Sequence, residues 1–424
     1  MLTNWCLPPL LSYRVGHCLF LAVTAAILFW SCASWEMAVV SVGSLLFMPQ
    51  VFSHGHLNAT DVPTACCWVL TITAWLRGET SWAWRLVAGI ACGLGLATKA
   101  TFVLVPLMLA AWIVLFRRWA WWRALLVLCV VASIVALACC PMWWGAPLSR
   151  CAAYYQAVFG NEQIWKIEVY YLGRSYVSGL QPIPWHSALI LPLVTTPPWT
   201  IALVVAALLS WFRTRDAAMG LWLLGAAALP VLRLLPRTPA HDGVRLLLPS
   251  LFCLAPLAGY GFVALTNQFR LISAIRRPLL CRWCIAIGLV VVGAGELASM
   301  HPYEMSYYSE LIGGLGGAER LGFEVSYWFE AFSPRALHEI ERLLPQGARV
   351  WTFPQYPGYT LLRQWGLWRE DLEDGDIGAA DYLILYTRKS RFYAVPGVEG
   401  VYLNQRPLWS LRCRGVQLVG LYKL

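Results

Sequence analysis

A short polar segment, residues 53–63, interrupts two apolar runs that are each long enough to enter a lipid bilayer. It contains the imidazoles of His54 and His56, the amide of Asn58 and the carboxylate of Asp61. Polar and ionisable groups at a membrane face are energetically costly, and for that reason they mark a functional site by default. Two structural alternatives are open: the segment is a solvated turn, or Asp61 caps the helix that follows it.

Basic side chains occur at the edges of later apolar runs. Lys99 lies inside an apolar stretch, Arg245 directly precedes another, and Arg174 follows a glycine in an aromatic segment. Ammonium and guanidinium groups bind phosphate through charge-assisted hydrogen bonds. The alternative for Lys99 is that its stem lies on apolar surface while its ammonium reaches the interface. We predict that Lys99, Arg245 and Arg174 bind the phosphate of a lipid.

Glycosyl transfer from a lipid phosphate would use these residue types. The phosphate is itself the leaving group, and the sequence has no P-loop and no glycine-rich strand-to-helix motif for a nucleotide. The cations would stabilise the charge on the departing phosphate. Asp61 would accept the proton of the acceptor hydroxyl as a general base. We therefore predict Asp61 as the catalytic residue, with no cofactor required.

Side chains that can hydrogen-bond or stack on a sugar are predicted to bind the substrate. For the two histidines of the 53–63 segment, hydrogen bonds to sugar hydroxyls are the expected use. A metal site is the alternative, with the histidines sharing a divalent cation with Asp61, or with His241 and Asp242, although no compact ligand motif supports it. The predicted substrate-binding residues are His54, His56, Asn58, Trp185, His186 and Asp242.

The composition identifies a membrane protein. Hydrophobic residues make up 59% of the chain and charged residues only 13%, with 24 tryptophans. These values exclude an ordinary soluble domain and indicate a polytopic helical membrane protein. The net charge of +10 comes mostly from basic residues in short connections between apolar runs, and we therefore expect no nucleic acid partner.

Ten apolar segments have the length and flanking charges of membrane spans. They lie near residues 15–34, 37–52, 62–76, 86–98, 101–116, 124–140, 188–211, 217–235, 246–266 and 283–299. Arginines gather in alternate connections, and the positive-inside rule places those connections in the cytoplasm. The 53–63 segment, Lys99 and everything after residue 300 then share the outer face. The same rule also places residues 1–14 outside, and we expect at least one earlier span to be missing from this sequence.

Two regions lie outside the predicted spans. Residues 141–187 are rich in Trp and Tyr and are predicted to form amphipathic helices in the outer interface, as part of a transmembrane domain over residues 1–300. Residues 301–424 are predicted to form an extracytoplasmic α/β domain. Its expected helices cover residues 334–344 and 359–365, and its expected strands cover residues 348–353, 381–386, 408–413 and 416–422.

Several of these segments resemble the membrane glycosyltransferases of the GT-C superfamily. The resemblance is closest to the dolichyl-phosphate-mannose protein mannosyltransferase and aminoarabinose transferase group, glycosyltransferase family 39 and its relatives, and covers roughly residues 15–330. It is carried by residues 56–63, 85–89, 97–101 and 245–249, with further similarity at residues 184–186 and 301–308.

The resemblance implies a polyprenyl-phosphate-sugar donor, inversion at the anomeric carbon and an active site on the outer face. Asp61 matches the acidic position of the family's second external loop, and Lys99 matches the lysine near the lipid phosphate. One departure is important: the family's principal catalytic acid lies in the first external loop, whereas this chain has no acidic residue before Glu36. The departure coincides with the span that the topology predicts to be missing.

Together these observations predict an inner-membrane glycosyltransferase that moves a mannose-like or related sugar from a polyprenyl-phosphate donor to a lipid, glycan or protein acceptor on the outer face. A lipid-linked sugar transporter would use the same cationic pocket, but its typical paired repeats are not seen in the sequence. A truncated, non-catalytic protein that binds the lipid-phosphate sugar is a further alternative.

Overall fold

The computed structural model describes residues 9–57, 60–160, 167–177, 181–235, 238, 242–268, 278–356, 358–376, 378–395 and 397–424. These residues form two compact units. The helical unit consists of the described parts of Met1–Trp165, Pro184–Pro239 and Val244–Ser299. The sheet unit consists of the described parts of Lys166–Ile183, Ala240–Gly243 and Met300–Leu424.

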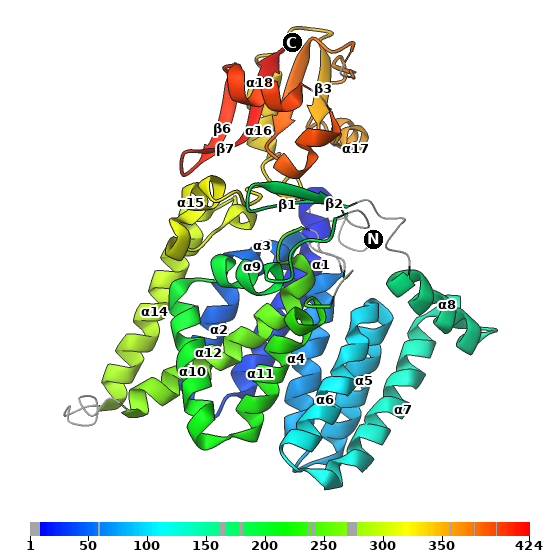
Figure 1. Ribbon diagram of the computed structural model, residues 1–424, viewed down its shortest axis with the longest axis vertical. Helices are drawn as coiled ribbons and strands as arrows, with labels where there is room; N and C mark the ends of the chain where they lie inside the picture. Colours follow the sequence, from blue (N-terminus) through cyan, green and yellow to red (C-terminus); the bar gives the residue numbers. More distant parts are fainter. Residues whose placement is uncertain are drawn as a thin grey trace. The chain divides into compact units, whose positions relative to one another are not determined.

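The helical unit is a bundle of mainly apolar helices (Figure 1). Its first half contains α1 (Pro9–Ser31), α2 (Trp35–Leu46), α3 (Pro49–Leu57), α4 (Asp61–Arg77), α5 (Trp82–Thr98), η2 (Ala100–Val103), α6 (Leu104–Leu115), η3 (Trp119–Trp121), α7 (Trp122–Cys139), η4 (Pro141–Trp143) and α8 (Pro147–Gly160). Its second half contains α9 (Ser187–Thr195), α10 (Pro198–Thr214), α11 (Ala217–Leu232), η5 (Arg245–Leu247), α12 (Leu248–Gln268) and α14 (Pro278–Met300). The predicted fold class, a polytopic helical membrane protein, is confirmed.

All ten predicted spans are helical in the part of the chain that the structure describes. Among the described residues, four helical stretches are long and apolar enough to cross a membrane, and the number rises to six if each of two bent pairs is one span. α2 and α3 meet at 65°, and α9 and α10 meet at 120°. Proline accounts for both bends, because Pro49 starts α3, while Pro197 precedes α10 and Pro198 starts it. A residue before proline avoids the helical region.

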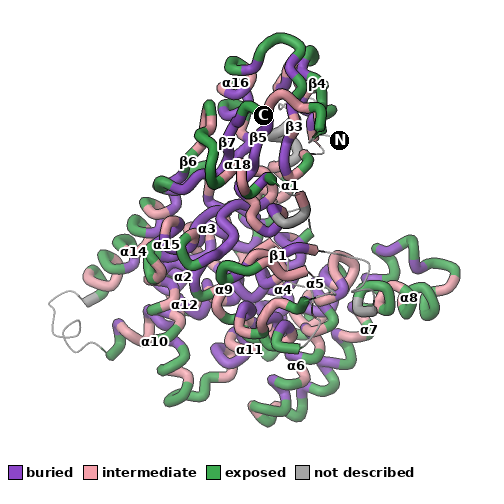
Figure 2. Tube along the Cα trace, turned by 45° about the horizontal axis from the view of Figure 1, so that its top comes forward, coloured by how far each residue is buried: buried purple, intermediate pink, exposed green. Residues whose placement is uncertain are grey.

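α12 is the most enclosed of the four long spans. Of its apolar window, 78% is buried, against 22% to 28% for the other three. It packs against α2, α4, α10 and α11, and Figure 2 shows buried residues gathered around α2, α4 and α12, with exposed residues along α8. Small residues allow the close approach: a Cβ on Gly261 of α12 would lie 1.8 Å from the carbonyl oxygen of Leu203 on α10.

The sheet unit contains a five-stranded mixed sheet in the order β4-β3-β5-β7-β6. β3 (Arg349–Phe353) pairs in parallel with β4 (Glu373–Asp374) and β5 (Tyr382–Tyr386), and β7 (Val416–Lys423) pairs antiparallel with β5 and β6 (Trp409–Cys413). Side chains of Phe353, Leu383, Leu385 and Tyr422 form its core. The helices of the unit are α15 (Gly314–Arg320), α16 (Pro334–Glu341), α17 (Tyr359–Gln364) and α18 (Val398–Asn404), with short turns at η6 (Glu304–Ser306), η7 (Glu310–Ile312) and η8 (Lys389–Ala394).

The secondary structure predicted for residues 301–424 is largely confirmed. Each of the four expected strands and both expected helices is present within a few residues of its predicted bounds. The two-residue strand β4 and the helix α18 were not predicted, because β4 is too short to show alternation and Gly400 interrupts the apolar pattern of α18.

The helical prediction for residues 141–187 is correct only in its first part. α8 (Pro147–Gly160) is a helix, but β1 (Glu168–Tyr171) and β2 (Arg174–Val177) form an antiparallel hairpin that belongs to the sheet unit. Valine and tyrosine dominate both strands and favour extended backbone. Leu172 and Gly173 have φ values of 50° and 77°, which suit a two-residue hairpin turn.

The close contact at Gly261 generates a prediction. Gly261→Ala should lower the melting temperature of the purified protein, because the new Cβ must displace the backbone of α10, and such overpacking costs about 1–3 kcal/mol or more. Gly288→Ala is the matched control, since nothing lies within 4 Å of a Cβ at Gly288 of α14. Differential scanning fluorimetry in detergent measures both. Equal melting temperatures for the two variants would contradict the close α10–α12 packing.

Candidate functional site

Three ionisable side chains that are far apart in the sequence meet at one end of the helical unit. The Asp61 carboxylate accepts a hydrogen bond from Lys99 Nζ on one oxygen, and from Arg245 Nε on the other at 2.8 Å. We call this group the ion triad, and the part of the bundle that holds it the Asp61 end. The structure thus brings together the catalytic residue and two of the phosphate-binding residues that the sequence predicted.

α4 places Asp61 at its first position, where the side chain is 0% exposed. A carboxylate at this position is favoured by the positive end of the helix dipole. Pro63 lies in the same first turn, where the missing N–H would have no partner within the helix. Thr60, the N-cap residue, makes no side-chain cap hydrogen bond. Asp61 is thus the first residue of the helix and not its N-cap, and its carboxylate holds two cations.

A break between α5 and η2 presents Lys99. The residue is extended, with φ −154° and ψ 134°, and its N–H donates to the carbonyl of Gly95 at 3.0 Å. A Cβ on Gly95 would lie 2.3 Å from the Phe102 ring, so glycine is required for the chain to fold back after the break. Because the backbone turns at Lys99, its side chain leaves the helix end rather than lying along an apolar face.

η5 presents Arg245 directly before α12. Pro249 occupies the second position of α12, which is compatible with a helix start. Like Lys99, the Arg245 side chain comes from the end of a well-packed helix. Its position therefore depends on the packing of α12 in the centre of the bundle.

The triad is asymmetric in its access to solvent. Asp61 is fully buried, whereas the side chains of Lys99 and Arg245 are 23% and 24% exposed. The carboxylate is therefore closed to an approaching anion, whereas each of the two cationic side chains is partly accessible. The group carries a formal charge of +1, since one carboxylate offsets one of the two cations. This arrangement can bind one phosphate through charge-assisted hydrogen bonds.

Arg233, which was not predicted from the sequence, is a further basic residue at this end of the bundle. It directly follows α11 and is only 8% exposed. The sequence gives one signal, an arginine between Leu232 and Leu234 inside a predicted span, and an ionisable residue in a span is a functional candidate by default.

The predicted histidines lie on α3, before the start of α4. His54 is buried, and His56 places Nδ1 3.0 Å from the carbonyl oxygen of Phe52. Asn58 and His241 lie outside the described residues. Among the residues that are described, no three His, Cys, Asp or Glu side chains are grouped as a metal site requires. The sugar-binding role of His54, His56 and Asn58 stays a prediction.

The remaining predicted residues are Arg174, predicted to bind the lipid phosphate, and three residues predicted to bind the substrate. In the helical unit, Trp185 is 61% exposed and its ring lies 5.8 Å from that of His186, the N-cap residue of α9. In the sheet unit, Arg174 is exposed at the start of β2, and Arg388 Nη2 donates to Asp242 Oδ1 at 2.8 Å. The roles predicted for these four residues stay predictions.

The partner of Asp242 belongs to a second buried charge cluster. Next to Arg388, the backbone N–H groups of Lys389 and Ser390 donate to the Glu324 carboxylate at 2.7 and 2.9 Å. Burial raises the pKa of the Glu324 carboxyl above its usual range. The Asp242 carboxylate is thus held inside the sheet unit by an ion pair that the sequence did not reveal.

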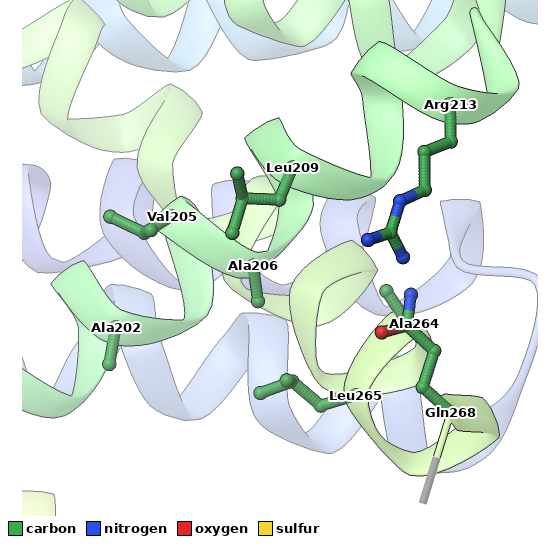
Figure 3. A pocket seen from close by; sticks show the side chains of 8 residues that line it. All are labelled: Ala202, Val205, Ala206, Leu209, Arg213, Ala264, Leu265 and Gln268. Atoms are coloured by element: carbon green, nitrogen blue, oxygen red, sulfur yellow. The ribbon is translucent and has the colours of Figure 1, made fainter.

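A cavity of about 220 Å³ lies between α10 and α12, away from the ion triad. The guanidinium of Arg213, at the end of α10, points toward Gln268, the last residue of α12 (Figure 3). Arg245 precedes the opposite end of α12, so this cavity is separate from the triad. Its lining residues are Ala202, Val205, Ala206, Leu209, Arg213, Ala264, Leu265 and Gln268.

Comparisons with known proteins show which sequences and folds the chain resembles. Residues 9–144 match the family described as dolichyl-phosphate-mannose-protein mannosyltransferase. The undecaprenyl phosphate-alpha-4-amino-4-deoxy-L-arabinose arabinosyl transferase of Pseudomonas aeruginosa is 29% identical over 231 residues, which cover 54% of this chain and 38% of that protein. The chain therefore aligns with well under half the length of this relative.

The solved structures of ArnT from Cupriavidus metallidurans share the fold. The apo structure matches 97% of this chain and 83% of its own, with 14% identity and a TM-score of 0.54. The structure bound to undecaprenyl phosphate matches 97% and 84%, with 12% identity and a TM-score of 0.50. The predicted resemblance to GT-C membrane glycosyltransferases is confirmed. The resemblance rests on the family match in the first third of the chain and on the fold match over almost all of the chain.

The burial of Asp61 generates a prediction about stability. The double variant Lys99→Ala/Arg245→Ala removes both cations from a carboxylate that has no access to solvent. Breaking a buried ion pair in this way costs about 3–5 kcal/mol of stability. Adding Asp61→Asn removes the charge and should recover most of the lost melting temperature. Thermal unfolding of the double and triple variants in detergent measures the recovery. A triple variant no more stable than the double variant would contradict the ion triad.

Proposed function

We propose that this chain is a membrane glycosyltransferase that moves a sugar, mannose-like or related, from a polyprenyl-phosphate donor to an acceptor hydroxyl. The ion triad is the observation that carries the proposal. A buried carboxylate holds two partly exposed cations in place, and these cations can bind a phosphate at the membrane surface. The resemblance to aminoarabinose and mannosyl transferases supports a polyprenyl-phosphate donor for this chain.

The proposed reaction is a displacement at the anomeric carbon of the donor sugar. The bond from that carbon to the phosphate oxygen breaks, and its electron pair stays on the phosphate. The acceptor oxygen forms the new bond from the opposite side, with inversion, and the hydroxyl proton passes to a base. The phosphate gains one negative charge, and Lys99 and Arg245 would stabilise it as it develops, because preorganised cations lower the barrier to such a step.

We propose that Asp61 contributes by positioning Lys99 and Arg245. Both of its oxygens accept hydrogen bonds from cations, and this favours the ionised form of a carboxylate and weakens it as a proton acceptor. Its role as the general base stays a prediction. Either role makes Asp61 necessary, but the two roles differ in what a neutral substitute does to phosphate binding.

We also propose that the Asp61 end of the bundle faces away from the cytoplasm. α4 runs from Asp61 to Arg77, and basic residues cluster at the opposite ends of several helices, including Arg118 before α7 and Arg213 at the end of α10. The positive-inside rule places such clusters in the cytoplasm. The acceptor would then be a lipid, glycan or protein at the outer face of the inner membrane, and the sheet unit would be extracytoplasmic.

Phosphate binding by the cations is testable directly. Lys99→Ala and Arg245→Ala should each lower the affinity of the purified protein for undecaprenyl phosphate at least tenfold, because each removes a charge-assisted hydrogen bond of about 1.5–3 kcal/mol. Native mass spectrometry in detergent measures the affinity. Arg213→Ala, an exposed arginine at the other end of the bundle, is the control and should bind as the parent does. Unchanged affinity in both triad variants would exclude the proposed site.

The positioning role of Asp61 predicts the direction in which the affinity for undecaprenyl phosphate should change. Asp61→Asn should bind undecaprenyl phosphate several-fold more tightly than the parent, because the carboxylate and the phosphate compete for the same two cations. Transfer of sugar in inner-membrane vesicles should fall at least tenfold, since the cations lose their fixed geometry. If transfer is lost while phosphate affinity stays unchanged, Asp61 acts as the base and not through the cations.

A further inference from the structure

Arg233 and the ion triad lie at similar positions along the bundle axis. A Cβ on Gly225 of α11 would lie 2.9 Å from Ile72 of α4 and 2.9 Å from Cys253 of α12, so the three helices meet there. At 1.5 Å per residue, Arg233 is about 12 Å from this contact along α11, and Arg245 is about 12 Å from it along η5 and α12.

The same contact also indicates where Asp61 lies along the bundle axis. Trp68 Nε1 lies 3.4 Å from the Cβ position of Gly225, and Asp61 is about 10 Å from Trp68 along α4. α11 also packs against η5, which begins with Arg245. The end of α11 and the starts of α4 and η5 are therefore at the same end of the bundle.

The guanidinium of Arg233 has an unsatisfied donor. Arg233 is 8% exposed, and its Nη1 has no hydrogen-bond partner among the described residues. A buried guanidinium without a carboxylate lowers stability unless another group pairs with it. Such a charge in a bundle of helices is a functional candidate, and the ligand that suits it is an anion.

The net charge of the ion triad indicates which anion Arg233 would bind. The ion triad carries +1, which matches the single negative charge of a polyprenyl-phosphate-sugar diester. Once the sugar has left, the phosphate is a monoester with a second pKa near 6, and at pH 7 it carries about −1.5 to −2. The triad alone leaves this additional charge without a cation.

We propose that Arg233 binds the additional negative charge that the phosphate acquires when the sugar leaves. The inference rests on the proposed function, because it assigns Arg233 to the same phosphate. Lys99 and Arg245 hold the phosphate in both donor and product, while Arg233 pairs with the product form. Its contribution is therefore larger for a dianionic phosphate than for a monoanionic one.

The test compares undecaprenyl phosphate affinity at pH 7.5 and pH 5 in the full-length protein. Arg233→Gln should lower the affinity about tenfold at pH 7.5, where the phosphate is a dianion, and about two- to threefold at pH 5, where it is a monoanion. Arg233→Lys keeps the charge and should retain most of the affinity. Arg213→Gln is the control at the far end of the bundle. Undecaprenol and inorganic phosphate serve as comparison ligands at both pH values.

Each outcome decides a separate point. Equal losses at the two pH values, or no loss, would overturn the role of Arg233 even if Lys99→Ala still weakens binding. Inorganic phosphate binding as tightly as the lipid would assign the site to free phosphate and overturn a lipid ligand. A parent protein that binds no undecaprenyl phosphate would instead overturn the proposed function.

Stability without ligand provides an independent readout. Because Nη1 of the buried Arg233 guanidinium has no hydrogen-bond partner among the described residues, Arg233→Gln should melt at the same temperature as the parent or higher. A lower melting temperature, or a variant that does not fold, would show that Arg233 has a structural partner and would overturn the proposal. Addition of undecaprenyl phosphate at pH 7.5 should raise the melting temperature of the parent more than that of Arg233→Gln.

Discussion

A carboxylate with no access to solvent is stable only while it is paired with cations. In this protein, that requirement constrains the positions of three helix ends. Asp61 is fully buried at the first position of α4 and binds Lys99 after α5 and Arg245 before α12. Charges in a low-dielectric surrounding interact strongly, and an unpaired one is costly. Displacement of either cation-bearing helix end would break one of these two ion pairs. The positions of the two cations are therefore set by the packing of the whole bundle, with α12 at its centre.

In this arrangement Asp61 positions the two cations, and the cations themselves would bind the phosphate. The carboxylate remains inaccessible, whereas the side chains of Lys99 and Arg245 are partly exposed. A site of this kind is preorganised for a phosphate, so little reorganisation is needed when charge develops on the leaving group. Its formal charge of +1 suits a phosphodiester. Arg233, buried at the same end of the bundle, supplies the additional charge that a departing phosphate monoester requires.

The sequence predicted the membrane fold and the members of the triad, because ionisable residues in apolar surroundings are visible without a structure. It did not predict that both cations bind one carboxylate, since residues 61, 99 and 245 share no periodicity and meet only through helix packing. Arg233 was missed because a single arginine near the end of an apolar run looks like a flanking charge. The β1–β2 hairpin was mistaken for helix because its aromatic residues also suit an interfacial helix. Asp242 pairs with Arg388, an interaction that depends on the fold of the sheet unit.

The central claim is that Lys99 and Arg245 bind the phosphate of a polyprenyl lipid while Asp61 holds them in place. An electron cryomicroscopy structure of the full chain with undecaprenyl phosphate tests this claim most directly. We expect phosphate oxygens within hydrogen-bond distance of Lys99 Nζ and the Arg245 guanidinium, with Asp61 still buried beside both cations. A lipid phosphate bound elsewhere on the protein, with the Asp61–Lys99–Arg245 contacts unchanged, would contradict it.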